Sequence, residues 1–203
     1  MHTQTAYAFV VAQFQQSIET PTRFFRENAA QLSQASFEMA KRFQRGGRLL
    51  VFGNGTSSTD AQHIAVEFVH PTTASKRSLP AIALTNDVGS MLGILNEFGS
   101  EEIYAQQLRL LATPDDMALG LTLDGNDENV LRGLIAAKQT GMLTLGLGGK
   151  DGGDLIRARG IDFCFLVPSD NLNVVQEVHE TAYHILWETV HVFLDHPGLM
   201  NER

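Results

Sequence analysis

The stretch that decides the fold is 48–68, which reads RLLVFGNGTSSTDAQHIAVEF. Its first five residues, 48–52, form a short apolar run of the kind found in strands that are covered on both faces of a sheet. A glycine-containing loop follows at 53–58, and apolar residues then recur at helical spacing. A buried strand, a tight loop and an amphipathic helix in this order predict the first half of a βαβ unit.

Four further apolar runs repeat this pattern along the chain, at 80–84, 117–121, 142–147 and 163–167. Helical stretches separate them, and strands joined by helical crossovers run parallel in one sheet. We therefore predict an α/β fold, with a doubly wound, five-stranded parallel sheet of the flavodoxin-like kind.

The first 47 residues show no strand pattern and are expected to be helical. Apolar residues recur every three to four positions on both sides of Pro21, which predicts two helices with a break at that proline. The glycines at 46 and 47 end the second helix. Its aromatic-rich stripe fits a subunit interface and a layer within the chain equally well.

The bulk properties of the 203-residue chain exclude several classes of protein. A hydrophobic content of 43% and a charged content of 19% are those of an ordinary globular protein. The formal net charge of −8, with scattered Lys and Arg, argues against direct binding of nucleic acid. No apolar run is long enough to cross a bilayer, and the first residues lack a secretory signal pattern. The single cysteine, Cys164, fits a reducing compartment, so we expect a cytoplasmic protein without membrane contact.

Ligands of an open parallel sheet bind at the carboxyl ends of its strands, which directs attention to the loop after 48–52. This loop contains Asn54, Gly55, Thr56 and Ser57. Its glycine allows tight backbone geometry, and hydroxyls with free N–H groups at a helix start can accept an anion. The same residues also serve as ordinary helix caps, so the loop alone leaves both interpretations open.

Two helices offer possible metal ligands. His63 and Glu67 are four residues apart and share one helix face, where they can chelate a divalent metal or form an ordinary polar pair. The last helix is richer, and spacing alone does not select which of its groups enter a site. Its candidate ligands and acid–base groups are Gln176, Glu177, His179, Glu180, His184, Glu188 and His191.

Several segments, in their order and spacing, resemble the sugar isomerase (SIS) domain family and specifically its phosphoheptose isomerases. The resemblance covers nearly the whole chain. It implies a single SIS domain over 1–203, in which 1–47 is a helical extension at a subunit interface of a homotetramer. Besides 48–68, the segments are LPAIALTND (79–87), LNEFGSEEIYAQQL (95–108), GMLTLGLGGKDGGDL (141–155) and VVQEVHETAYHIL (174–186).

The resemblance implies a metal-dependent aldose–ketose isomerase that acts on a sugar phosphate through an enediol. The metal, commonly zinc in that family, would be held by His63, Glu67, Gln176 and His184. Glu67 would be the base toward carbon and His184 the acid toward oxygen. The substrate-binding positions carried over by resemblance are Asn54, Gly55, Thr56, Ser57, Glu97, Thr122, Asp124, Asp127 and Gln176.

The chain departs from the family in the second phosphate loop, at 120–127. Thr122 keeps a hydroxyl, whereas Asp124 and Asp127 stand at hydroxyl positions. Two carboxylates beside a phosphate are unfavourable unless they are protonated or bridged by a cation. A basic family position is Pro71 here, and an acidic one is Asn173. We therefore predict that the metal and proton-transfer half of the site is kept and that the phosphate half is rebuilt.

Two other functions remain open at this point. One is a non-catalytic SIS tetramer that binds a partner, of the replication-initiation-associated type, and the other is a sugar-phosphate sensor. Glu67 and His184, which the partner-binding branch lacks, favour the enzyme.

Overall fold

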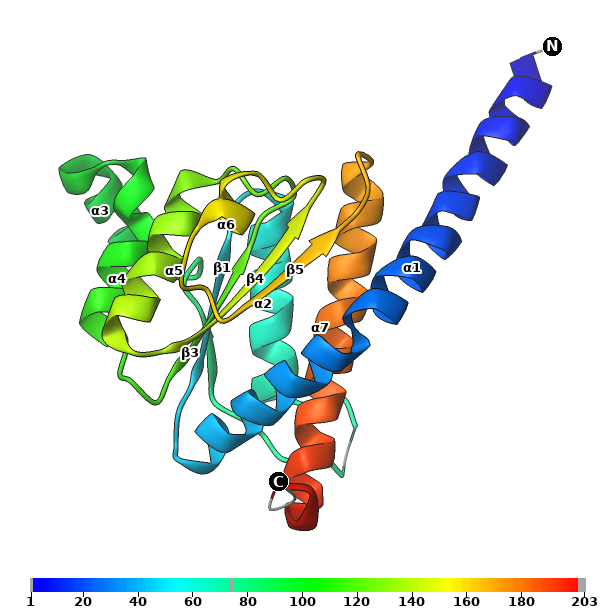
Figure 1. Ribbon diagram of the computed structural model, residues 1–203. Helices are drawn as coiled ribbons and strands as arrows, with labels where there is room; N and C mark the ends of the chain where they lie inside the picture. The colour runs from blue at the N-terminus through cyan, green and yellow to red at the C-terminus, as the bar shows by residue number, and fades with distance from the viewer. Residues whose placement is uncertain (1, 74, 201–203) are drawn as a thin grey trace.

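Five parallel strands form the sheet at the centre of the molecule (Figure 1). The computed structural model describes residues 2–73 and 75–200. In spatial order the strands are β2 (Ala81–Ala83), β1 (Leu49–Gly53), β3 (Met117–Leu121), β4 (Leu143–Gly149) and β5 (Phe163–Val167). Every adjacent pair is parallel, so the predicted fold class is confirmed, and each predicted apolar run contains one strand or most of it.

Helices cover both faces of the sheet because successive side chains of a strand point to opposite faces. In β1, Leu49 and Val51 join the core beneath three helices, while Leu50 and Phe52 join the core on the other face. The first face carries α1 (His2–Gln44), α2 (Thr56–Val69) and α7 (Leu172–Asp195). The second carries α4 (Ile103–Leu111), α5 (Glu128–Thr140) and α6 (Gly153–Arg157). The remaining elements are α3 (Val88–Phe98) and two short 3-10 helices, Ser100–Glu102 and Pro197–Met200.

The predicted break at Pro21 is wrong, because α1 is one helix that continues through this proline. Proline removes one helical hydrogen bond and usually bends a helix, and α1 bends on its way across the molecule (Figure 1). The Thr22 hydroxyl donates to the carbonyl of Ile18 at 2.7 Å, which adds a local hydrogen bond at this point. A single lost bond therefore deforms the helix without ending it.

The two halves of α1 have different environments. The second half packs along α7 and buries residues such as Phe24 and Met39 in the core. The first half projects away from the sheet (Figure 1). Its apolar side chains are exposed within the chain, namely Tyr7, Phe9, Val10, Val11, Phe14 and Ile18. None of the described helices is both long enough and apolar enough to span a bilayer.

Asp116 joins the end of α1 to the start of β1 and β3. Its carboxylate is buried and accepts hydrogen bonds from the backbone N–H of Arg48 and of Thr113, each at 2.8 Å. It also forms an ion pair of 2.9 Å with the Arg48 guanidinium. Burial alone would raise the pKa of Asp116, but these hydrogen bonds outweigh it and hold the pKa below its usual value.

We expect Asp116→Ala to lower the free energy of unfolding at pH 7 by about 3 kcal/mol, because it leaves Arg48 and two backbone donors without their acceptor. Because folding lowers the pKa of Asp116, its stabilisation of the folded state is fully present above the pKa of about 4 that it has in the unfolded chain. This stabilisation is lost as the pH falls through the pKa of the folded state. Urea unfolding at several pH values measures both effects. Asp115→Ala is the control, because its exposed pair with Arg45 at 3.8 Å should contribute little. Equal losses in the two variants at pH 7 would contradict the assignment.

Candidate functional site

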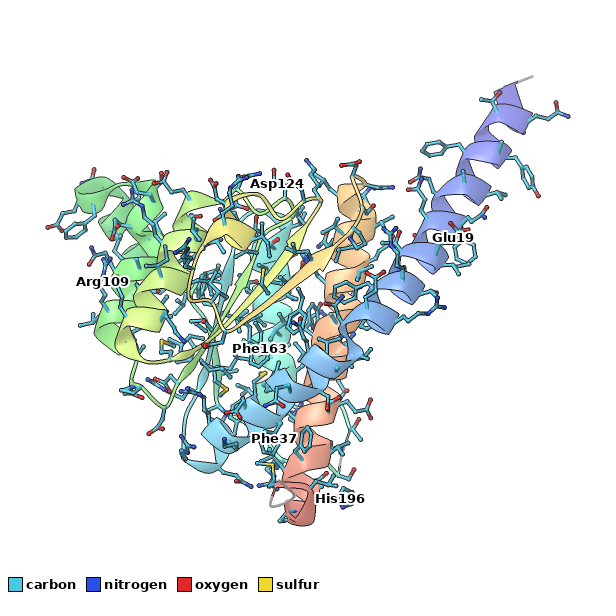
Figure 2. All side chains as sticks on the ribbon, in the orientation of Figure 1. Glu19, Phe37, Arg109, Asp124, Phe163 and His196 are labelled. Carbon is cyan, nitrogen blue, oxygen red and sulfur yellow. The ribbon has the colours of Figure 1, made fainter. Side chains whose placement is uncertain are left out.

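The candidate site lies where β1 and β3 end side by side. The helix after β1 crosses to one face of the sheet and the helix after β3 to the other, which makes this a topological switch point, the place where open α/β sheets bind ligands. Figure 2 shows Asp124, in the loop after β3, at this carboxyl edge of the sheet. The Asn54 amide joins the two loops, since it donates to Asp127 Oδ1 at 2.6 Å and to Asn129 Oδ1 at 2.8 Å. The Tyr104 hydroxyl donates to the Gly53 carbonyl at 2.6 Å.

Glycine is required where α2 leaves β1. A Cβ on Gly53 would lie 2.7 Å from the Cβ of Ser57 and 2.8 Å from the carbonyl oxygen of Leu121, so the first turn of α2 packs directly on the strand ends. Gly55 precedes the helix with a φ of 54°, and no side chain caps the helix start. The Ser58 N–H donates to the Gly55 carbonyl at 3.0 Å, and the N–H groups that precede it are left for other acceptors.

Ser57 adds an unpaired hydroxyl to this helix start. The residue is 1% exposed, and its Oγ has no hydrogen-bond partner among the residues that the structure describes. A buried polar atom without a partner is costly, so an acceptor supplied by a ligand would stabilise it.

The two aspartates of the second loop have different partners. Asp127 accepts hydrogen bonds from the Thr122 hydroxyl and from Asn54, so it occupies the donors of both loops. Among the described residues, the Asp124 carboxylate accepts only a local bond, from the backbone N–H of Asn126 at 3.0 Å. Asp127 therefore satisfies from within the chain two groups that would otherwise face a ligand.

A second cluster lies between α2 and α7, on one face of the sheet. Glu67 Oε1 is 3.4 Å from His63 Nε2 and 3.2 Å from His184 Nε2. The Glu67 side chain is 16% exposed, whereas each imidazole is about two-fifths exposed, at 42% and 41%. The two imidazoles are in edge contact, with ring centroids 5.3 Å apart. His63, Glu180 and His184 also bring ligand atoms within 4.8 Å of one another. These groups are nitrogen and oxygen donors of the kind that bind zinc.

Polar side chains of both helices orient the cluster. The Gln176 amide nitrogen donates to both carboxylate oxygens of Asp60, at 3.1 and 3.2 Å. The nitrogen of the Gln176 amide, and not its oxygen, therefore faces Asp60. The Tyr183 hydroxyl lies 3.1 Å from His63 Nδ1, which leaves Nε2 as the ring nitrogen nearest Glu67.

The cluster carries excess negative charge. Asp60, Glu67 and Glu180 form no ion pair with Lys or Arg within 2–73 and 75–200. Burial raises the pKa of Tyr183, and the charges of these three carboxylates raise it further. Burial also raises the pKa of Asp60, with an added contribution from Glu180. Carboxylates gathered around imidazoles without a basic partner form a site that favours a cation.

The comparisons with known proteins identify the family of this chain. A family model described as SIS domain matches residues 13–149. The phosphoheptose isomerase of Roseiflexus sp. (strain RS-1) is 38% identical over 182 residues, which cover 90% of this chain and 91% of that protein. The chain belongs to the phosphoheptose isomerase family of SIS-domain proteins.

Other relatives match as fully. The phosphoheptose isomerase of Aquifex aeolicus is 39% identical over 87% of this chain and 92% of its own length. The structure of a phosphoheptose isomerase from Francisella tularensis superposes with a TM-score of 0.84 at 30% identity, covering 95% of this chain and 99% of that one. The phosphoheptose isomerase from Neisseria gonorrhoeae also gives 0.84, at 28% identity and with 91% and 98% covered.

Within this family fold, the chain brings the four predicted metal ligands close to one another. His63, Glu67 and His184 meet in the α2–α7 cluster, and Gln176 adjoins it through Asp60. Glu97 lies elsewhere, exposed on α3, which Figure 1 shows on the far side of the sheet from α7. Its predicted contact with substrate remains a prediction.

The other polar groups of α7 separate into core and surface. His179 is fully buried, its Nε2 lies 3.0 Å from the Gly148 carbonyl oxygen, and burial lowers its pKa to about 4. His191 is also buried, between the carbonyls of Trp187 and Arg77. Both are structural groups. Lys76 and Arg77 pair with Asp195 at the far end of α7.

Asp60 and Tyr183 were not among the predicted site residues. A signal for Asp60 was present, since positions 60, 63 and 67 lie on one helix face at steps of three and four. Tyr183 precedes His184, and no spacing rule places its hydroxyl on a residue of another helix.

Proposed function

We propose that this chain is a metal-dependent aldose–ketose isomerase that acts on a sugar phosphate or a closely related sugar, as its relatives' names suggest. The observation that carries the proposal is the position of Glu67 Oε1 between the Nε2 atoms of His63 and His184. A base and an acid at one spot, beside candidate metal ligands, are what an enediol mechanism requires.

The donor set fits a divalent metal, and zinc is the best match. Zinc bonds of about 2.1 Å in tetrahedral geometry place neighbouring ligand atoms about 3.4 Å apart. The measured separations of 3.4 and 3.2 Å agree with that spacing. His63, Glu67 and His184 would hold the ion, with the Gln176 amide oxygen as a fourth ligand that Asp60 orients. Nitrogen and oxygen donors of this kind are those that zinc accepts.

In this proposal each residue has a defined task. Glu67 moves a proton between C1 and C2 of the sugar, and His184 exchanges a proton with a substrate oxygen. A proton on His63 Nδ1, donated to the Tyr183 oxygen, leaves the Nε2 lone pair directed at the cluster. A divalent metal bound here supplies electrostatic stabilisation of negative charge that develops on the substrate oxygens.

The anion half of the site supports altered phosphate recognition. Ser57 and the start of α2 offer donors to an anion. In the second loop, by contrast, the Asp127 carboxylate already accepts the hydrogen bonds of Thr122 and Asn54 and adds a negative charge beside them. A substrate that presents hydroxyls to the second loop, or carries its anionic group nearer α2, suits this arrangement better than one whose phosphate contacts both loops.

We further propose that the protein is a cytoplasmic homotetramer without nucleic-acid partners. Exposed apolar residues on the first half of α1 support association. So does α3, which has no buried residue although Val88, Leu92, Leu95 and Phe98 lie on it. The number four follows the family resemblance, and the native mass in solution checks it.

We expect the protein purified without chelators to contain a stoichiometric amount of zinc per chain. We also expect it to interconvert sedoheptulose 7-phosphate and its aldose isomers. EDTA should abolish turnover and added zinc should restore it. Bound metal without turnover would redirect the search to other sugars. The absence of both bound metal and turnover would overturn the isomerase proposal and would favour a partner-binding protein.

We expect Asp127→Ser to strengthen the binding of inorganic phosphate at least tenfold. At an effective dielectric of 20, a unit charge about 5 Å from an anion costs roughly 3 kcal/mol, and solvent screening reduces this figure. Calorimetric titration with phosphate measures the change. Asp124→Ser is the matched control and should have a smaller effect, because its carboxylate caps only its own turn. Equal affinity in the wild type and Asp127→Ser would contradict the assigned role of Asp127.

A further inference from the structure

Glu180 places a second carboxylate beside the two imidazoles of the α2–α7 cluster. It lies one helical turn from Gln176 and one from His184, on the same face of α7. Its carboxylate oxygen and one ring nitrogen each of His63 and His184 all lie within 4.8 Å of one another. The pair of imidazoles is thus approached by Glu67 from α2 and by Glu180 from α7.

The two carboxylates differ in how they are held. Glu67 is 16% exposed, its carboxylate is within 3.4 Å of both rings, and the Trp187 indole donates to its backbone carbonyl at 3.1 Å. Glu180 is exposed, and its flexible side chain forms no ion pair with Lys or Arg in the described part of the chain. A change of side-chain rotamer is enough to bring it closer to the rings, because they already lie within reach.

The proposed chemistry gives Glu67 two tasks that compete. A carboxylate that donates a lone pair to a cation is a weaker base, because the positive charge favours its ionised form. When Glu67 accepts a proton, only neutral groups, namely His63, His184 and Gln176, would remain to hold a doubly charged ion. A second carboxylate at the same place would offset this loss of negative charge, and Glu180 is the one that the structure puts there.

We propose that Glu180 is an additional metal ligand, which would hold the cation together with His63 and His184 while Glu67 carries the proton. This inference rests on the metal centre of the proposed function. It assigns the two carboxylates different roles, with Glu180 for affinity and Glu67 for turnover.

The experiment compares zinc affinity and isomerase activity in the wild type, Glu180→Gln, Glu67→Gln and the double variant. Zinc affinity is measured by competition with a chromophoric chelator. Glu180→Gln should weaken zinc binding at least about tenfold, the lower end of the effects seen when groups around a metal are removed. Glu67→Gln should keep stoichiometric zinc but lose turnover by about a hundredfold or more. The double variant, which keeps only neutral ligands, should bind zinc more weakly than either single variant.

Glu177→Gln is the matched control, because it removes the same charge from an exposed position on the same helix and should bind zinc as the wild type does. Zinc affinity of Glu180→Gln within twofold of the wild type would overturn the inference. The inference would also be overturned if Glu67→Gln lost as much zinc as the double variant does. A wild type that binds no zinc would overturn the metal-dependent function itself, and the two failures are therefore distinguishable.

Discussion

The site depends on the packing of α7 against α2 on one face of the sheet. Three polar side chains of α7 contact α2 directly. The Gln176 amide binds Asp60, the Tyr183 hydroxyl contacts His63, and the Trp187 indole binds the backbone carbonyl of Glu67. Apolar residues of both helices, including Ile64 and Leu186, bury the rest of the contact in one core. Because these contacts recur along the two helices, the fold sets the relative position of the helices that carry the imidazoles and carboxylates.

The loops at the switch between β1 and β3 are constrained in a different way. Asn54 joins the two loops through its side-chain amide, Tyr104 of α4 donates to the carbonyl of Gly53, and α2 starts against the strand ends at Gly53. Asp127 places a charge within this network, and burial raises the pKa of Tyr104 to about 12 with a further contribution from that charge. The hydroxyl of Tyr104 therefore remains a donor at neutral pH. The charge at these loops therefore differs from that of a site made only of hydroxyls and N–H groups.

The sheet could be predicted from sequence because strands buried on both faces read as continuous apolar runs, and all five runs became strands. The course of α1 could not, since the effect of Pro21 depends on whether packing against α7 compensates for one lost hydrogen bond. In the site, helix spacing paired His63 with Glu67 and resemblance selected His184 and Gln176. Partners between helices, such as Asp60 with Gln176, are set by tertiary packing that no single-helix periodicity contains.

The atoms around the metal are the most direct test of a catalytic centre between α2 and α7. X-ray absorption at the zinc edge of the loaded protein measures them without any assumption about the substrate. We expect only nitrogen and oxygen neighbours, with the scattering pattern of two imidazoles for His63 and His184. A sulfur neighbour, for which Cys164 on β5 is the sole thiol of the chain, or a shell without imidazole would contradict a metal centre at this place.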